Sequence, residues 1–377
     1  MYKIITLVAV ATIILVSCKP QTKSTGSMAK FDEAPEWAAS AIWYQIFVER
    51  FRNGNPNNDP TMETNRGALI DEIPASWQIT PWGHNWYVQE SWAKETGLDF
   101  YRTIQMRRYG GDLEGVMQKV NYLQDLGINA VYFNPLNDAP SLHKYDARNY
   151  HHIDVTFGDD RDGDLALMKK EDPSKPESWV WTSADKKFVE LISQFHKAGI
   201  KVVLDFSWNH TGTQFWAFQD IIKNGASSRF AGWYEIKTFD NAATPENEWN
   251  YDGWLGIKSL PELKKIRESE KKFGHAFEGN MPEEVKAHIF AVCKRWMDPN
   301  NDGNPDDGID GMRLDVAEHV PLGFWRDMRK YVRSVNESFY LVGENWWTQW
   351  PDELMDAEPW VKGDVFDAVM HYQWYKP

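Results

Sequence analysis

Residues 311–319 read G-M-R-L-D-V-A-E-H, and residues 339–344 read F-Y-L-V-G-E. Each stretch has a short apolar run that ends near a carboxylate, at Asp315 in the first and at Glu344 in the second. If the first run is a strand, Arg313 and Asp315 point to the same face, because they are two residues apart. Two carboxylates at the ends of neighbouring strands can flank one scissile bond, as nucleophile and proton donor. The arginine is expected to keep the first carboxylate ionised.

The same kind of strand recurs along the chain, in alternation with helices. Ile128–Phe133 and Lys201–Phe206 are short and apolar, which is typical of buried strands, and Phe366–Met370 is a further candidate. Leu113–Gly127 and Lys187–Gly199 carry apolar residues at helical spacing. Apolar strands that alternate with amphipathic helices predict a parallel sheet covered on both faces.

Polar side chains of catalytic type follow these strands at their C-terminal ends, which is the active face of a (β/α)8 barrel. A doubly wound sheet would also place a site there, but no G-x-G-x-x-G sequence follows a first strand. We therefore predict an α/β fold, a (β/α)8 TIM barrel within residues 37–377. About six of its strands are expected in this chain, beginning with the β-rich stretch Ala41–Phe51.

Two connections are too long to be ordinary loops. Residues 211–282 follow the third strand and contain four tryptophans among many turn residues, which predicts a small inserted domain rather than disorder. Residues 61–108 form a second insertion that is equally rich in tryptophan.

Composition limits the class of partner. Of the 377 residues, 42% are hydrophobic and 25% are charged, which is the balance of a folded globular protein. The net charge of −14 argues against nucleic acid, because a phosphate backbone requires a basic face. The 20 tryptophans can stack on the apolar faces of sugar rings or fill an ordinary core.

The N-terminus has the pattern of a bacterial lipoprotein signal. The apolar run Ile4–Val16 is too short for a permanent membrane span, and it leads into L-V-S-C, which resembles a lipobox. Residues 1–17 are therefore predicted to be a signal peptide, Cys18 the lipidated residue and residues 18–36 a polar tether. The alternative is a chance cysteine after an ordinary signal. The predicted location is the bacterial cell envelope, periplasmic or at the cell surface, with membrane contact through the lipid anchor only. The one further cysteine, Cys293, then has no partner for a disulfide within the chain.

Four segments, in order along the chain, resemble those of the α-amylase family of glycoside hydrolases, nearest the neopullulanase and cyclomaltodextrinase group. D-F-S-W-N-H at 205–210 matches D-x-x-x-N-H, and residues 311–319 match G-x-R-x-D-x-x-x-H. Gly343-Glu344 matches the acid after the fifth strand, and L-P-E-L at 260–263 resembles the L-P-D-L of the inserted domain. Their order and spacing argue against a chance match, and the resemblance runs from about Trp37 to the last residue.

The resemblance implies a retaining mechanism with Asp315 as nucleophile and Glu344 as general acid/base. The tryptophans that follow Glu344 predict an apolar environment, which suits a proton donor. Asp205 and Asn209 are expected to shape the mouth of the barrel. The alternative is a buried ion pair of purely structural role at residues 313 and 315. The implied substrate-binding residues are Tyr145, His210, Arg313 and His319.

Structural Ca²⁺ is the implied metal. N-G-N-P-N-N-D at 53–59 resembles the neopullulanase-type N-G-D-P-x-N-D loop, and Gly110-Gly111-Asp112 matches the Gly-Gly-Asp that completes it. This chain has asparagine at position 55, which removes one negative charge, and a plain turn is the alternative. The implied ligands are Asn53, Asn55, Asn58, Asp59, Gly110 and Asp112. A second acidic loop, 298–306, is either a calcium loop or a solvated turn, because the twelfth position from its start is Ile309 rather than glutamate.

The implied activity is hydrolysis of α-glucans such as maltodextrin, pullulan or cyclodextrin, at α-1,4 links and, as an option, at α-1,6 links. The family has a third carboxylate in an N-H-D motif after the seventh strand, and this sequence has no such motif. We therefore interpret the chain as a fragment that lacks the end of the barrel. The alternatives are a lipid-anchored glycan-binding protein with an incomplete active site and an α-glucan transglycosylase of the same family.

Overall fold

The computed structural model describes residues 33–68, 73–241 and 243–372. The predicted signal peptide and Cys18 lie outside these residues, as does nearly all of the predicted tether. Asp32–Pro377 forms a compact unit, to which the following description applies. None of the helices in the described part of the chain has the length and apolar character needed to cross a membrane.

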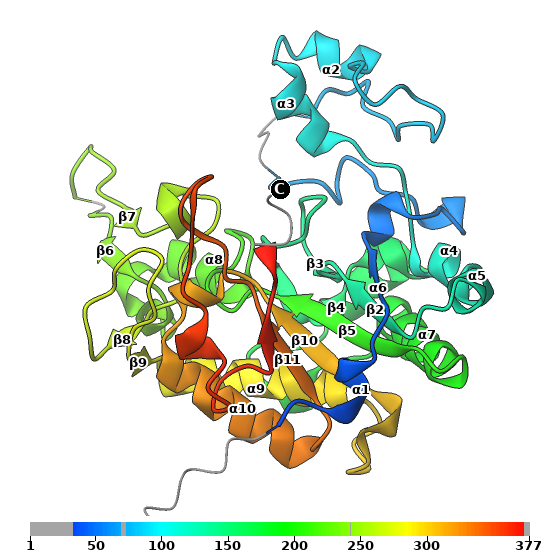
Figure 1. The fold of residues 1–377 in the computed structure, drawn as a ribbon. Coiled ribbons are helices and arrows are strands. Elements are labelled where there is room, and N and C mark those ends of the chain that lie inside the picture. Colours follow the sequence, from blue (N-terminus) through cyan, green and yellow to red (C-terminus); the bar gives the residue numbers. More distant parts are fainter. Residues whose placement is uncertain (1–32, 69–72, 242, 373–377) are drawn as a thin grey trace, which may run out of the picture. The chain divides into compact units, whose positions relative to one another are not determined.

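A six-stranded parallel sheet lies at the centre of this unit (Figure 1). Strands that follow one another in the sheet also follow one another along the chain, which is the connectivity of a (β/α)8 barrel. The prediction of a partial barrel with about six strands is confirmed. In spatial order the strands are β1 (Trp43–Ile46), β2 (Ala130–Phe133), β5 (Lys201–Phe206), β10 (Gly311–Leu314), β11 (Tyr340–Gly343) and β14 (Ala368–Val369).

Three of these strands are shorter than the apolar runs that predicted them, and β2 begins at Ala130 rather than at Ile128. β1 stops before Val48–Arg50, which forms the 3-10 helix η1. The carboxylate of Glu49 is buried there and accepts the backbone N–H groups of Tyr109 and Gly110, so the chain leaves the sheet at this point. β14 covers only part of Phe366–Met370. β5 has its predicted bounds, and β11 lies within the apolar run that precedes Glu344.

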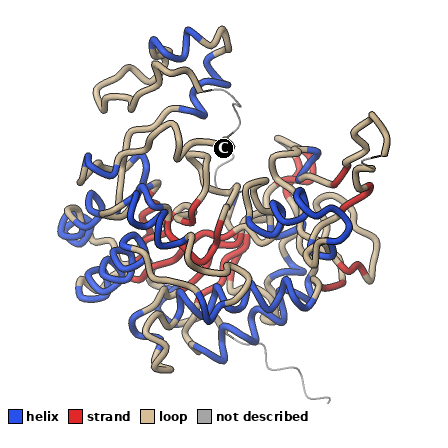
Figure 2. Tube along the Cα trace, turned by 180° about the vertical axis from the view of Figure 1, so that it is seen from behind, coloured by secondary structure: helices blue, strands red, loops and turns tan. Residues whose placement is uncertain are grey.

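Helices surround the sheet, as the view from behind shows (Figure 2). α7 (Ser183–Lys197) begins earlier than predicted, because Thr182 and Asp185 form a capping box at its N-terminus. α9 (Glu283–Met297) and α10 (Leu322–Val335) pack against each other. Their apolar faces and the strands share one hydrophobic core.

The predicted helix Leu113–Gly127 is divided into α4 (Leu113–Met117) and α5 (Val120–Asp125). The N–H of Lys119 donates to the carbonyl of Val116 at 2.8 Å, three residues back, which closes α4 with a tighter turn. The other short elements are α1 (Glu36–Ala39), β3 (Asn137–Asp138), β4 (Asn149–Ile153), α6 (Arg161–Met168), β12 (Trp347–Gln349) and β13 (Glu353–Leu354).

The two insertions differ in how they are packed. Residues 211–282 contain α8 (Trp216–Asn224), the paired strands β6 (Ile236–Thr238) and β7 (Asn250–Tyr251), and the pair β8 (Ile266–Arg267) and β9 (Gly279–Asn280). Most buried aromatic side chains of this segment, Trp233 among them, belong to the core of the barrel. Residues 61–108 carry α2 (Ser91–Glu95) and α3 (Phe100–Thr103) and have a separate small core around Trp77 and Trp92.

Candidate active site

The two predicted catalytic carboxylates follow directly on two neighbouring strands. β10 and β11 are hydrogen-bonded in parallel, and the register places Leu314 opposite Gly343. Asp315 and Glu344 come one residue later on each strand, and the N–H of Glu344 donates to the carbonyl of Leu314 at 2.9 Å. The backbone ladder therefore sets the spacing of the pair.

A single guanidinium joins both carboxylates. Arg313 places Nη1 2.7 Å from Oδ1 of Asp315 and Nη2 2.6 Å from Oε1 of Glu344. Nη1 also lies 3.1 Å from each carboxylate oxygen of Asp205, at the end of β5. Asp205 therefore belongs to the charged centre and does more than shape the mouth of the barrel.

One cation faces three buried carboxylates in this centre. Burial raises the pKa of Asp315 well above its usual range; Arg313 opposes this shift, while the charges of Glu344 and Asp205 add to it. Burial likewise raises the pKa of Asp205. Arg313 thus favours the ionised form of Asp315, as expected, but its positive charge is shared with two further carboxylates.

Two tyrosines in the centre were not predicted from the sequence. The hydroxyl of Tyr372 donates to Oε1 of Glu344 at 3.0 Å, and that of Tyr132 donates to Oδ2 of Asp205 at 2.5 Å. Tyr132 is the only residue of β2 with a polar side chain, and this was an available signal. Tyr372 follows the last predicted strand, where catalytic-type residues are expected.

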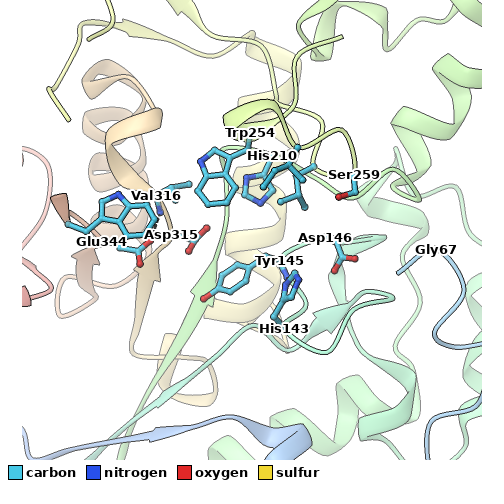
Figure 3. Close-up of a pocket in the computed structure, with 13 residues that line it drawn as sticks. Gly67, His143, Tyr145, Asp146, His210, Trp254, Ser259, Asp315, Val316 and Glu344 are labelled. Carbon is cyan, nitrogen blue, oxygen red and sulfur yellow. Dashed lines mark hydrogen bonds between the residues drawn. The ribbon is translucent and has the colours of Figure 1, made fainter. Parts of the chain in front are cut away.

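A cavity of about 390 Å³ opens beside the pair. Asp315 lies between Glu344 and Tyr145, and Trp254 stands above it in the view of Figure 3. The hydroxyl of Tyr145 donates to Asp205 at 2.8 Å, which fixes its ring at the floor of the site. The wall is formed by Gly67, His143, Tyr145, Asp146, His210, Trp254, Ile257, Ser259, Leu260, Asp315, Val316, Glu344 and Trp346.

The two predicted substrate-binding histidines lie in different positions. His210 lines the cavity, and its ring stacks on Trp254 at 5.6 Å between centroids. Burial and then the positive charge of Lys265 lower the pKa of His210 to about 3, so the ring is a neutral hydrogen-bonding group. His319 does not line the cavity: Nδ1 lies 3.2 Å from Nζ of Lys271 and Nε2 lies 3.1 Å from Oε1 of Glu318.

The backbone between the two carboxylates is strained. Val316 has φ 40° and ψ 49°, in the left-handed region that β-branched residues avoid. Such a residue costs about 1–3 kcal/mol, and strain of this kind collects at functional sites. The unusual turn directs the N–H of Val316 to Oε2 of Glu344 at 3.0 Å, so it holds the second carboxylate in place.

The predicted calcium loop brings part of its ligand set together. Oδ1 of Asn53 and Oδ1 of Asn58 are buried and have no hydrogen-bond partner within the described residues. Nδ2 of Asn53 donates to Oδ1 of Asp59 at 2.6 Å, and Gly110 closes the loop with φ 71°. Unpartnered oxygens beside a carboxylate fit a hard cation such as Ca²⁺.

The remaining predicted ligands are engaged by the backbone. Asp112 is the N-cap of α4: its carboxylate accepts the N–H groups of Gly115 at 2.6 Å, Asn55 at 2.8 Å and Gly54 at 3.0 Å. The side chain of Asn55 accepts the N–H of Asn57 at 3.2 Å. These contacts give Asp112 and Asn55 a capping role in the loop.

The second acidic loop has the contacts of a turn. The carboxylate of Asp298 accepts the N–H groups of Asp302 at 3.2 Å and Gly303 at 3.1 Å, and Asp302 accepts the N–H of Asn304 at 2.8 Å. Such bonds from Asx side chains to the backbone stabilise a turn without a metal. They favour the solvated turn over the calcium loop.

Comparisons with known proteins agree with this geometry. The family described as "Alpha amylase, catalytic domain" matches residues 45–172 and 183–377. Neopullulanase 2 of Thermoactinomyces vulgaris is 35% identical over 90% of this chain and 43% of its own length. Cyclomaltodextrinase of Geobacillus thermopakistaniensis is 33% identical over the same shares. The chain thus spans less than half the length of these curated relatives.

Solved structures show the same relation. The type III pullulan hydrolase from Thermococcus kodakarensis superposes with a TM-score of 0.64 at 27% identity, covering 91% of this chain and 48% of the other. Cyclic alpha-maltosyl-(1-->6)-maltose hydrolase from Arthrobacter globiformis has a TM-score of 0.61 at 28% identity, covering 90% and 56%. The fold, the carboxylates at the strand ends and these matches together establish that the chain belongs to the α-amylase family of glycoside hydrolases.

Proposed function

We propose that this chain carries the catalytic pair of a retaining glycoside hydrolase that acts on α-glucans. The observation that carries the proposal is the single guanidinium that touches both Asp315 and Glu344. Retaining enzymes hold their two carboxyl groups about 5–5.5 Å apart, whereas inverting enzymes leave room for a water between them. Two carboxylates held by the two terminal nitrogens of one arginine fit the closer arrangement.

The proposed reaction has two steps. Asp315 attacks the anomeric carbon while protonated Glu344 gives its proton to the leaving oxygen; Glu344 then takes a proton from water, which releases the sugar from Asp315. In the first step negative charge disappears from Asp315 and appears on Glu344. Because Arg313 contacts both, the moving charge stays beside the same cation throughout.

The proposed substrate class rests on the lining of the cavity and on the relatives. Trp254, Trp346 and Tyr145 offer flat rings for stacking on glucose units, and neutral His210 can bond a hydroxyl. The names of the relatives include neopullulanase, cyclomaltodextrinase and a hydrolase of a cyclic α-1,6-linked maltose. We infer that α-1,4 links, and α-1,6 links as the second option, are cut in maltodextrin, pullulan or cyclodextrin.

The test is turnover of maltodextrin and pullulan by the wild type and by Glu344→Gln, with Glu337→Gln as the control at an exposed carboxylate. Loss of the proton donor is expected to lower kcat by about 10²–10⁴-fold, while the control keeps full activity. Wild type that binds maltooligosaccharide but releases no reducing ends would instead establish a glycan-binding protein. Products longer than the substrate would identify a transglycosylase.

We also propose that Asn53, Asn58 and Asp59 hold a structural Ca²⁺, because the buried amide oxygens of Asn53 and Asn58 have no partner within the described residues and Asn53 contacts the carboxylate of Asp59. When bound, the ion would tie the loop after η1 to Gly110. It has no part in the chemistry at Asp315.

We further propose that Cys18 is lipidated and that the protein belongs to the bacterial cell envelope, on the support of the L-V-S-C sequence. Labelling of growing cells with radioactive palmitate is expected to mark the wild type and to leave Cys18→Ser unlabelled. Equal labelling of both proteins would refute the anchor.

A further inference from the structure

A cluster of ionisable side chains lies apart from the cavity, between β4 and the segment that leads to α7. Nε2 of His151 is 2.7 Å from Oε1 of Glu171, and Nε2 of His152 is 3.0 Å from the same oxygen. Both imidazoles are fully buried, and the Glu171 side chain is 3% exposed. Two imidazole nitrogens and one carboxylate oxygen, each able to ligate a metal ion, thus lie close together.

Each of the three side chains is held by a second contact. Oδ2 of Asp185 lies 2.7 Å from Nδ1 of His152, and the N–H of Val180 donates to the second oxygen of Glu171 at 2.9 Å. The ring of His151 stacks on Trp179 with 4.2 Å between centroids. Contacts of this kind fix the ring orientation and leave Nε2 of both histidines directed at Oε1 of Glu171.

The charges around the cluster leave room for a cation. Glu171 and Asp185 are the two carboxylates, and Arg295 is the cation that contacts Asp185, at 2.9 Å. The guanidinium of Arg295 also packs over the ring of Trp181 at 3.7 Å. Although burial opposes it, Asp185 and Glu171 raise the pKa of His152 to about 9, so a metal ion would displace a proton from this ring. With both imidazoles neutral, as metal ligation requires, these groups carry a net negative charge that a divalent ion would offset.

We propose that His151, His152 and Glu171 form a site for a transition-metal ion, with Zn²⁺ as its natural occupant. Two imidazole nitrogens and one carboxylate oxygen are a donor set that suits Zn²⁺, whereas Ca²⁺ and Mg²⁺ prefer oxygen throughout. Ligands about 2.0–2.1 Å from a tetrahedral Zn²⁺ lie roughly 3.3 Å from one another. The separations of 2.7 and 3.0 Å need to open by only a few tenths of an ångström.

The Asp185–His152 contact has the form of a carboxylate–histidine–metal triad, in which the outer carboxylate orients the ligand and raises its basicity. The competing arrangement is a hydrogen-bonded one, in which Glu171 accepts from both rings and no metal enters. Nδ1 of His151 has no hydrogen-bond partner within the described residues in either arrangement, so the metal content of the protein decides between the two.

The location suggests what the ion would do. The family match runs over residues 45–172 and 183–377, so it is interrupted at residues 173–182. Trp179 and Val180, which hold two of the proposed ligands, lie in this interruption, and Glu171 lies just before it. A metal bound here would fasten a segment that departs from the family pattern onto β4 of the barrel. The site is therefore structural and independent of the catalytic pair.

The test is the zinc content of the purified protein after exposure to Zn²⁺ and gel filtration, with Ca²⁺ present throughout to occupy the calcium loop. We expect one equivalent of zinc and a raised Tm for the wild type. Glu171→Gln and His152→Asn should lose the zinc, while His196→Gln should keep it. His196 is the control because it pairs with Asp310 at 2.7 Å, away from the cluster.

A second measurement covers the case in which a ligand variant does not fold. Co²⁺ added to the wild type is expected to give the intense visible absorption of a four-coordinate site with nitrogen and oxygen ligands, and Zn²⁺ should displace it. Wild type that retains no zinc and shows no such absorption would overturn the proposal. Zinc retained equally by folded Glu171→Gln would overturn it as well.

Discussion

At the scale of single residues, the active centre depends on how one positive charge is divided. Arg313 contacts Asp205, Asp315 and Glu344, and the hydroxyls of Tyr132 and Tyr372 donate to the first and last of these. The motif at 311–319 predicted that Arg313 and Asp315 lie side by side, because they are close in sequence. The tyrosines were missed although their positions near strand ends were visible in the sequence, since the carboxylate that each contacts depends on which strands become neighbours.

The pKa of His210 predicts a specific dependence of stability on pH. Burial lowers the pKa of His210 from 6.5 to about 3, so between these values the unfolded state binds a proton that the folded state does not. The stability contributed by neutral His210 is therefore complete above pH 6.5 and is lost as the pH falls toward 3. We expect His210→Gln to flatten this part of the curve, by up to about 1.4 kcal/mol per pH unit.

The measurement is the unfolding free energy from urea titrations across this pH range. His275→Gln, at an exposed histidine, is the control and should reproduce the wild-type slope. Identical slopes for His210→Gln and the wild type would show that His210 is protonated in the folded protein.

At the scale of elements, strands were easier to predict than loops. β5 matches its predicted bounds and β11 lies within the apolar run before Glu344, because a buried strand is apolar along most of its length. The break between α4 and α5 was missed, since apolar spacing continues across it. The cluster at His151, His152 and Glu171 was missed too, because its residues follow no recognisable spacing and meet only through tertiary packing.

The glycines of two turns allow a matched test of the calcium loop. Gly110 and Gly199 both have left-handed φ, of 71° and 75°, so alanine at either is expected to cost about 1–2 kcal/mol. A Cβ at Gly199 would meet no atom within 4 Å, whereas one at Gly110 would lie 2.7 Å from Nδ2 of Asn53 and against the carboxylate of Asp59. Gly110→Ala should therefore lose more unfolding free energy than Gly199→Ala.

Chemical denaturation with and without Ca²⁺ measures this difference. The stabilisation by Ca²⁺ should be weakened in Gly110→Ala and unchanged in Gly199→Ala. Equal losses in the two variants, with an equal response to Ca²⁺, would place the ion elsewhere.

At the scale of the whole molecule, the six-stranded sheet and its order could be predicted because each strand can be recognised from a short run of its own sequence. The packing of residues 211–282 into the barrel core could not be predicted. Turn residues and aromatic residues are equally typical of a separate small domain. The chain covers less than half the length of the curated relatives named above, and its sheet includes the two strands that position Asp315 and Glu344.

Calcium removal is the prediction that belongs to this scale, because the loop at 53–59 ties the end of η1 to the turn before α4. Chelation is expected to lower the Tm, and Ca²⁺ alone should restore it. Asp59→Asn should abolish this response, while Asp302→Asn in the exposed turn at 298–306 should retain it. A Tm that does not change on chelation would exclude the site.

The register of β10 against β11 bears on how enzymes of this kind can diversify. The parallel pairing of β10 with β11, which places Leu314 opposite Gly343, sets the separation of Asp315 and Glu344. Tyr145 and Trp254 instead lie on connections outside the sheet. Mutation and selection can therefore rebuild the connections to accept another sugar chain while the reaction itself is inherited unchanged. A one-residue deletion within β11 would do the reverse: it would turn Glu344 to the opposite face while Tyr145 and Trp254, which stand on other connections, stay in place.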